Sequence, residues 1–279
     1  MRQVTIKIVL LFVAMISSVV TYASEHYMEY VDSADTYINN KEWAKAEEFI
    51  LKALHDEPAN YNNSLLLSNL ATIQRIEGRN DEAVNNYSLA LNITPNSVTL
   101  LNNRGMLYYE LDSLALAKRD FARVMELDKK DVDSRYMYSI ILIEESDLKA
   151  AKDVIDDMKF ISPISAETVE VQARWNQASG KYKDAIKQYT LLLSKKERVD
   201  WIISRAECHL AVRNLTPAGN DINDALKIEP ENAYLYLLKA KLNKFLYQND
   251  ESLKNLEKAV SYGISREYAE AFVSEAAQN

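Results

Sequence analysis

Pairs of small residues, twelve positions apart, recur seven times along this chain of 279 residues. Successive pairs begin 33 to 37 residues apart, and four of the seven copies end with a proline twelve residues after the second small residue. Such a period indicates an array of supersecondary units, because a single unit of this size cannot bury its apolar face alone. The pairs are Ala34/Ala46, Ala71/Ala83, Gly105/Ala117, Ser139/Ala151, Ala173/Ala185, Ala206/Ala218 and Ala240/Ser252.

Each copy is predicted to hold two antiparallel helices. In the copy over 64–97, apolar residues three and four positions apart, such as Leu67, Leu70 and Ala71, share one helical face, and a second set of this kind follows. Gly78 lies between the two sets, where glycine readily takes the left-handed conformation that ends a helix. A closing proline cannot extend the helix before it, because it lacks an N–H and its ring clashes with the preceding turn.

This pattern resembles the tetratricopeptide repeat (TPR) family, whose repeats carry small residues at positions 8, 20 and 27 and proline at 32. The resemblance implies an all-α fold, a right-handed α-solenoid of stacked antiparallel helix pairs. It covers nearly all of the chain after residue 23, so we expect a single solenoid over 24–279 with a C-terminal capping helix over about 266–277. The copies are assigned to 27–60, 64–97, 98–131, 132–165, 166–198, 199–232 and 233–266.

The first 23 residues do not follow the repeat. Arg2 and Lys7 precede an apolar run over 8–16, and smaller residues lead to Ala23, which is the form of a secretory signal peptide cleaved after Ala23. The run is shorter than the roughly 20 residues that span a bilayer. We therefore expect a bacterial protein that is exported to the periplasm or secreted, and soluble rather than membrane-integral after cleavage. An uncleaved signal anchor is the alternative.

Charge and motifs argue against several classes of function. The formal net charge of −8 disfavours nucleic-acid binding, which depends on clustered Lys and Arg. The sequence contains no phosphate loop, dinucleotide fingerprint or metal-binding motif. Cys208 falls at a repeat position that other copies fill mostly with apolar residues, and His209 at one that holds Tyr37, Tyr108 and Leu142 in other copies, so both are expected in the core. We predict no cofactor, no metal and no enzymatic activity, with a hydrolase built from scattered acidic residues as a remote alternative.

In the TPR family, the first helix of each copy lines the inner groove of the solenoid, and the resemblance assigns the groove positions. Asparagine at one of these positions often holds an extended peptide, because its amide both donates and accepts hydrogen bonds. Asn69 and Asn103 occupy this position in adjacent copies. Packing within the inner curve is the alternative for Met106 and Ile140. The candidate partner-binding residues are Asn69, Arg75, Asn102, Asn103, Met106, Tyr109, Tyr136, Ile140 and Arg174.

The sequence thus predicts a non-catalytic interaction scaffold that binds a protein or an extended peptide in its groove, as part of an envelope, secretion or assembly complex. The basic residues of the family's carboxylate clamp are absent, so a partner that presents a chaperone tail is not expected. A self-associating structural or spacer component of such an assembly is the alternative. At the positions that form the carboxylate clamp in the family, copies one to three carry Val31, Asp35, Asn69, Thr99 and Asn103.

Overall fold

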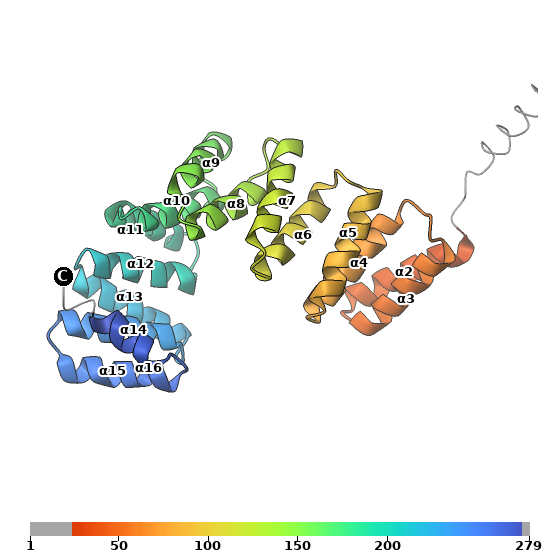
Figure 1. Ribbon diagram of the computed structural model, residues 1–279. Helices are drawn as coiled ribbons and strands as arrows, with labels where there is room; N and C mark the ends of the chain where they lie inside the picture. Colours follow the sequence, from red (N-terminus) through yellow and green to blue (C-terminus); the bar gives the residue numbers. More distant parts are fainter. Residues whose placement is uncertain (1–23, 275–279) are drawn as a thin grey trace, which may run out of the picture. The chain divides into compact units, whose positions relative to one another are not determined.

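The computed structural model describes residues 24–274, and the regular secondary structure in this range is entirely helical (Figure 1). The predicted signal peptide over 1–23 lies outside the described residues. No helix within 24–274 combines the length and the hydropathy of a membrane span. The helices are α2 (Glu25–Asn39), α3 (Trp43–Asp56), α4 (Asn63–Ile76), α5 (Asn80–Ile93), α6 (Val98–Glu110), α7 (Leu114–Leu127), α8 (Asp133–Glu144), α9 (Leu148–Ile161), α10 (Ala166–Ala178), α11 (Tyr182–Leu193), α12 (Val199–Ala211), α13 (Leu215–Ile228), α14 (Ala233–Phe245), α15 (Asn249–Ser261) and α16 (Arg266–Ser274).

Each expected copy holds one helix pair, from α2 and α3 in the first copy to α14 and α15 in the seventh. The two helices of a pair pack against each other, and within each unit described below the second helix of a copy contacts the first helix of the next. The final helix, α16, packs on α14 and α15 and buries Ala269 and Val273. The expected all-α fold of stacked helix pairs with a capping helix is therefore confirmed.

The helices fall into two compact units, one ending at Leu127 and the other beginning at Asp128. Unit 1 contains α2 to α7, and unit 2 contains α8 to α16. Each unit has its own buried apolar clusters, for example around Tyr87 in unit 1 and Ile222 in unit 2. The single solenoid over 24–279 stays a prediction.

The small residues of the repeat allow the two helices of a pair to approach closely. All of them are buried, most with no exposed surface at all. At Gly105 the approach is so close that an added Cβ would lie 2.9 Å from the ring of Phe121 on the partner helix. Cys208 and His209 are buried as well, as the repeat positions predict. The helix spacing thus follows from residue size at these positions.

The turn between the two helices contains a left-handed residue at the same position in all seven copies. Copies two and five place glycine there, Gly78 with φ of 77° and Gly180 with φ of 73°. The other five use residues with a side chain, for which this conformation costs roughly 1 kcal/mol. The packing of the two helices therefore determines the turn, whichever residue occupies it. These five are Lys41, Asp112, Ser146, Arg213 and Tyr247, with φ between 54° and 63°.

A buried ion pair of the same design occurs once in each unit. In unit 1, Arg104 on α6 donates from Nε and Nη2 to the two carboxylate oxygens of Asp120 on α7, at 2.7 and 2.8 Å. The remaining nitrogen, Nη1, donates to Ser88 of the preceding copy at 3.0 Å. The bidentate pair joins the two helices of one copy, and the bond to Ser88 links that copy to the preceding one. The corresponding residues in unit 2 are Arg205, Asp221 and Thr190.

Candidate partner-binding surfaces

The first helices of successive copies lie next to one another and form what we call the first-helix face of each unit. In unit 1, an ion pair joins α4 to α6 on this face. In unit 2, side-chain hydrogen bonds join α8 to α10, α10 to α12, and α12 to α14. The candidate residues predicted from the sequence all lie on these faces.

In unit 1, the candidate residues Asn69 on α4 and Asn103 on α6 are half-buried, and their side chains bond to none of the described residues. Each amide therefore keeps its donor and acceptor groups for another molecule or for water. This is the arrangement that recognition of a peptide backbone requires.

The other candidates in unit 1 are partly engaged by the protein itself. Arg75 on α4 donates from Nε to Oε2 of Glu110 on α6 at 2.8 Å, and its Nη2 contacts Oε1 of the same carboxylate. The hydrogen bonding to Glu110 raises the pKa of Arg75. Asn102 and Tyr109 are half-buried and also interact with other groups. Met106 is half-buried. Arg75 is therefore half of an inter-copy ion pair and not a free cation.

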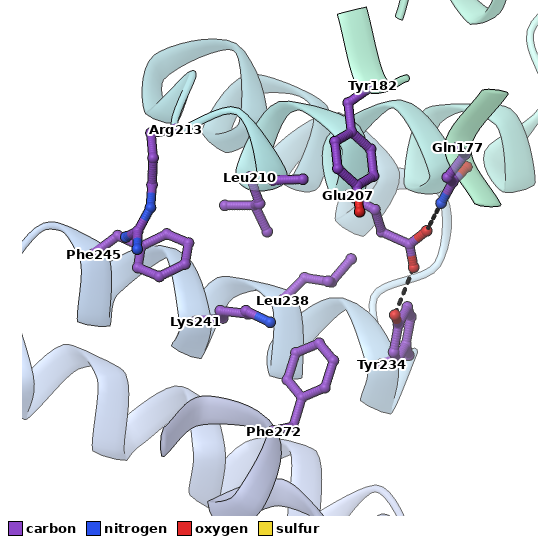
Figure 2. Close-up of a pocket in the computed structure, with 11 residues that line it drawn as sticks. Gln177, Tyr182, Glu207, Leu210, Arg213, Tyr234, Leu238, Lys241, Phe245 and Phe272 are labelled. Carbon is purple, nitrogen blue, oxygen red and sulfur yellow. Dashed lines mark hydrogen bonds between the residues drawn. The ribbon is translucent and has the colours of Figure 1, made fainter. Parts of the chain in front are cut away.

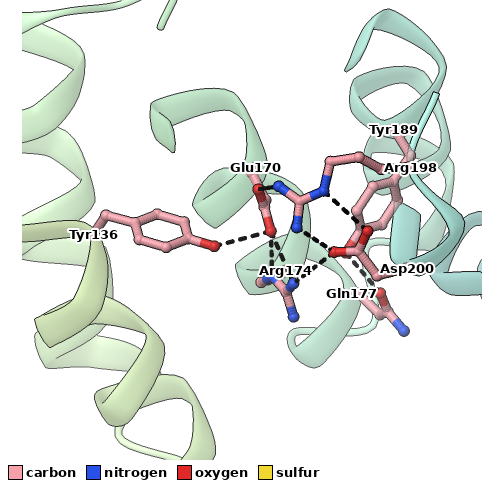
Figure 3. Close-up of polar contacts among 7 residues, drawn as sticks. All are labelled: Tyr136, Glu170, Arg174, Gln177, Tyr189, Arg198 and Asp200. Carbon is pink, nitrogen blue, oxygen red and sulfur yellow. Dashed lines mark hydrogen bonds and ion pairs between the residues drawn. The ribbon is translucent and has the colours of Figure 1, made fainter. Parts of the chain in front are cut away.

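In unit 2, the first-helix face is organised around the buried carboxylate of Glu170 on α10 (Figure 3). Tyr136 on α8 donates its hydroxyl to Glu170 at 2.9 Å, and Arg174 donates from Nε and Nη2 at 3.0 and 2.8 Å. Arg198 adds a contact of 3.3 Å and also holds Asp200 through two hydrogen bonds. The two carboxylates and two guanidinium groups balance each other's charge, so this network links α8, α10 and the start of α12.

Protonation in this network follows from burial and charge. Burial raises the pKa of Tyr136, and the neighbouring Glu170 carboxylate raises it further, so the hydroxyl stays a donor near neutral pH. Burial lowers the pKa of Arg174, but the hydrogen bond to Glu170 and the charges of nearby groups together outweigh it, so the pKa lies above its ordinary value. Tyr136 therefore joins two copies through Glu170, and Arg174 bonds to Glu170 on its own helix and lies 3.7 Å from Asp200 of the next copy.

A second polar chain crosses the same face closer to α16. Gln177 on α10 donates to Oε2 of Glu207 on α12 at 2.7 Å, and Tyr234 on α14 donates to Oε1 at 2.5 Å. Tyr189 in turn donates to the amide oxygen of Gln177 at 3.0 Å. Burial and the Glu207 carboxylate raise the pKa of Tyr234. Glu207 thus accepts hydrogen bonds from two neutral donors on the neighbouring first helices.

Two cavities open on the first-helix face of unit 2, and Gln177 and Glu207 line both of them. The larger, of about 470 Å³, lies among α10, α12, α14 and α16, with Leu210 and Leu238 in its wall (Figure 2). The smaller, of about 310 Å³, is lined by Ile140 and Arg174 among others. Their volumes are in the range of side-chain and small-ligand sites.

The nine predicted residues thus form two groups. Six lie together on α4 and α6 of unit 1, and three lie on α8 and α10 of unit 2. The prediction did not include the residues of the larger cavity, although most of them fill groove positions of the repeat in copies five to seven. Arg213 lies in the turn after α12, outside the groove positions, so the repeat pattern did not indicate it. Lys241 is recognisable from the sequence as a groove residue but is not among the nine candidates, and the sequence did not single out Gln177, Glu207, Tyr234 or Arg213.

Comparisons with known proteins identify the repeats. A family model described as TPR repeat matches residues 73–112, and one described as tetratricopeptide repeat matches residues 98–131. A tetratricopeptide repeat protein from Parabacteroides merdae has a solved structure that superposes with a TM-score of 0.75, at 24% identity, over 92% of this chain and 100% of that one. PilW, described as a type IV pilus biogenesis factor, gives a TM-score of 0.62 at 20% identity over 75% and 96%.

The curated relatives are larger proteins. The BBSome complex member BBS4 of Bos taurus is 23% identical over 232 residues, which are 80% of this chain and 43% of that protein. The chain spans less than half the length of the curated relatives that it matches. The family matches thus show tetratricopeptide repeats over residues 73–131, and the solved structures show that the chain shares their fold of stacked helix pairs.

Proposed function

We propose that this protein is an exported, non-catalytic scaffold that binds a protein or an extended peptide on its first-helix face. The observation that carries the proposal is the pair of half-buried amides of Asn69 and Asn103 on neighbouring helices of unit 1, without partners among the described residues. An extended peptide presents alternating N–H and C=O groups, and a side-chain amide can bond to both. The export part of the proposal depends on the sequence of residues 1–23.

Crosslinking tests the binding surface. A photoreactive phenylalanine analogue at position 69 or 103 is expected to form adducts with a partner protein in the cell envelope of the source organism. The same analogue at the exposed Leu116, on the second helix α7, is the control and should form none. Adducts of equal yield at all three positions, or none at 69 and 103, would exclude the first-helix face of unit 1 as the binding surface.

Substitution tests the two amides. The double variant Asn69→Ala/Asn103→Ala should weaken partner capture about tenfold, because two amide contacts are lost at about 0.5–1.5 kcal/mol each, while the helical circular dichroism stays unchanged. Asn92→Ala, at an exposed asparagine on the second helix α5, is the matched control. Unchanged capture by the double variant would contradict the proposed role of the amides.

Export has its own test. Mass spectrometry of the protein isolated from the envelope fraction should find Ser24 as the first residue if the signal is cleaved after Ala23. An intact N-terminus with membrane association would indicate the signal anchor instead. A protein found only in the cytoplasm would contradict this part of the proposal and leave the binding surface untouched.

One observation favours the alternative of self-association. Phe160 and Ile164, at the end of α9 and just after it, are 93% and 78% exposed. Apolar groups exposed to this extent are candidates for contact with a second copy. Light scattering should then give a mass that rises with concentration and falls back to 31.9 kDa or below in Phe160→Ser. A monomer at all concentrations would exclude this alternative.

A further inference from the structure

The larger cavity of unit 2 has two chemically different ends (Figure 2). Glu207 lies at one end, held by Gln177 and Tyr234. Arg213 lies at the other end, and Lys241 extends into the space between them beside Phe272, which Leu210 and Leu238 also line. The leucines are only 3% and 1% exposed and form the floor, whereas the half-buried rings of Phe245 and Phe272 supply the accessible apolar surface. The cavity therefore presents two cations, an apolar surface and a hydrogen-bonded carboxylate to a ligand.

The two cations rest on aromatic rings and lack an acidic partner. The Arg213 guanidinium lies 3.6 Å from the ring centroid of Phe245, and Lys241 Nζ lies 4.2 Å from that of Phe272. Neither side chain forms an ion pair with a residue within 24–274. Contact with an aromatic face positions a cation without neutralising it, so both keep their charge available to an anion.

Arg213 is an exception among the arginines of this acidic protein. The other ten arginines within 24–274 each contact a carboxylate or a backbone carbonyl oxygen, as in the pairs of Arg79 with Glu47 and Arg266 with Glu257. With a formal net charge of −8, acidic side chains are plentiful. Two cations left without acidic partners in one cavity thus form a local positive site on an otherwise negative molecule.

We propose, building on the proposed function, that this cavity binds an acidic residue within an extended partner peptide. The Asp or Glu carboxylate lies between Lys241 and Arg213, and a neighbouring apolar side chain of the peptide packs against the rings of Phe245 and Phe272, next to Leu210 and Leu238. Charge complementarity selects an anion, and the apolar surface selects a peptide over a free inorganic ion. The smaller cavity shares Gln177 and Glu207, so the chain continues beyond the acidic residue, which favours an internal residue over a free C-terminus.

The probes are two blocked peptides, acetyl-Leu-Asp-Phe-Asp-Leu-amide and its uncharged analogue with Asn in place of both Asp residues. Binding is followed by the NMR methyl signals of Leu210 and Leu238 in the protein. The acidic peptide should shift both sets of signals in a saturable way and bind at least tenfold more tightly than the Asn peptide. Raising the salt concentration should weaken the acidic peptide more than its analogue.

Variants identify the residues responsible. Lys241→Gln should weaken binding of the acidic peptide at least fivefold. Arg213→Gly should do the same while the protein becomes more stable, because Gly78 and Gly180 occupy the corresponding left-handed position in other copies. This combination separates lost binding from lost folding. Lys239→Gln, on the same helix with its amino group on Asn223, is the matched control and should change binding less than twofold.

Each other outcome overturns the inference. Equal binding of the two peptides in the cavity would exclude the acidic specificity while peptide binding as such stands. Absence of methyl shifts with both peptides would exclude the cavity, whereas crosslinking at Asn69 and Asn103 separately decides the function of unit 1. If deletion of residues 275–279 shifts the Leu210 and Leu238 signals in the absence of peptide, the occupant is the protein's own C-terminal segment.

Discussion

The first-helix faces of the two units use polar side chains in different ways. In unit 2, Glu170 accepts a hydrogen bond from Tyr136 on α8, and Glu207 accepts bonds from α10 and α14, so most polar groups around them are satisfied within the protein. In unit 1, Asn69 and Asn103 have no such partners within 24–274. Both units join copies through polar groups, as Arg75 and Glu110 do in unit 1, but unit 1 also leaves two amides available to another molecule.

The difference teaches that position in the repeat alone does not identify a binding residue. Tyr136 and Arg174 occupy groove positions of the repeat, yet both bond to Glu170. What distinguishes a candidate contact is the hydrogen-bonding or charge capacity that remains after the contacts between copies are made. By that criterion, the candidate contact residues are Asn69 and Asn103 in unit 1 and Lys241 and Arg213 in unit 2.

The largest expected effect concerns the arginine–aspartate ion pair, of which each unit has its own. Asp120→Ala should lower the free energy of unfolding of unit 1 by about 3 kcal/mol, because Arg104 would lose its buried partner. Asp221→Ala should cost unit 2 about 1 kcal/mol less, since the Arg205 side chain is 22% exposed and that of Arg104 only 13%. Native-state hydrogen exchange measures each unit separately. Equal losses in both units would contradict the role given to solvent exposure.

The control for this prediction removes both charges together. Copy two carries Leu70 and Asn86 at the repeat positions of Arg104 and Asp120. The double variant Arg104→Leu/Asp120→Asn should therefore recover most of the stability that Asp120→Ala loses, because no buried charge is left without a partner.

The second prediction tests the comparison directly. Glu170→Gln should lower the free energy of unfolding of unit 2 by about 2 kcal/mol, because Arg174 and Arg198 lose the charge that they share. Asn103→Ala should change that of unit 1 by less than about 0.5 kcal/mol, as expected for a side chain outside any network. Hydrogen exchange of the same two units provides the measurement. A cost for Asn103→Ala close to that for Glu170→Gln would remove the distinction between the two faces.

The third prediction concerns the left-handed turns between paired helices, which occur in both units. Ser146→Gly in unit 2 and Asp112→Gly in unit 1 should each stabilise their unit by about 1 kcal/mol, because glycine adopts positive φ without strain. Gly78→Ala and Gly180→Ala should destabilise by a similar amount through the backbone alone, since an added Cβ meets no atom within 4 Å at either site. Thermal unfolding followed by circular dichroism detects these changes. A loss of stability in Ser146→Gly would show that its side chain contributes more than the backbone strain costs.

The smallest effect is a pH dependence confined to unit 2. Burial lowers the pKa of His209 below its ordinary 6.5, Asp221 opposes this, and Arg205 adds to it. As the pH falls below 6.5, the unfolded chain takes up a proton that the folded chain does not, so unit 2 loses stability until the folded pKa is reached. His209→Asn should remove this component, because Asn176 and Asn243 fill the same repeat position. Urea unfolding between pH 7 and 5 provides the test, and identical pH profiles for the two proteins would contradict it.

The helices were predictable because their signal is local. Residue size at Ala71 and Ala83 and glycine at Gly78 act within one copy, and the predicted pairs agree with the observed helices. Five left-handed turn residues escaped prediction, because side chains such as those of Arg213 and Tyr247 do not favour that conformation and helix packing imposes it.

The candidate surfaces were less predictable, because they depend on contacts between copies. Arg75 has the same repeat position whether or not Glu110 of the next copy reaches it, and only the structure shows that it does. The cations of the larger cavity needed the rings of Phe245 and Phe272, and Phe272 comes from the capping helix. The sequence could thus predict which residues lie on the first helices. Which of their side chains keep unused hydrogen-bonding groups or charge depends on contacts between copies, which only the structure shows.

The left-handed turns also bear on the order in which this protein folds. A turn that contains glycine forms readily before its helices are packed, whereas a turn at Lys41 or Tyr247 gains stability only once the pair is in place. Gly78 and Gly180 occur one in each unit. Apart from the turn at Gly263 before the capping helix, each unit thus has one copy whose helix pair is joined by a glycine turn, from which neighbouring copies can be added in both directions. We expect the kinetic signature of two nuclei, with transition-state structure concentrated in copies two and five.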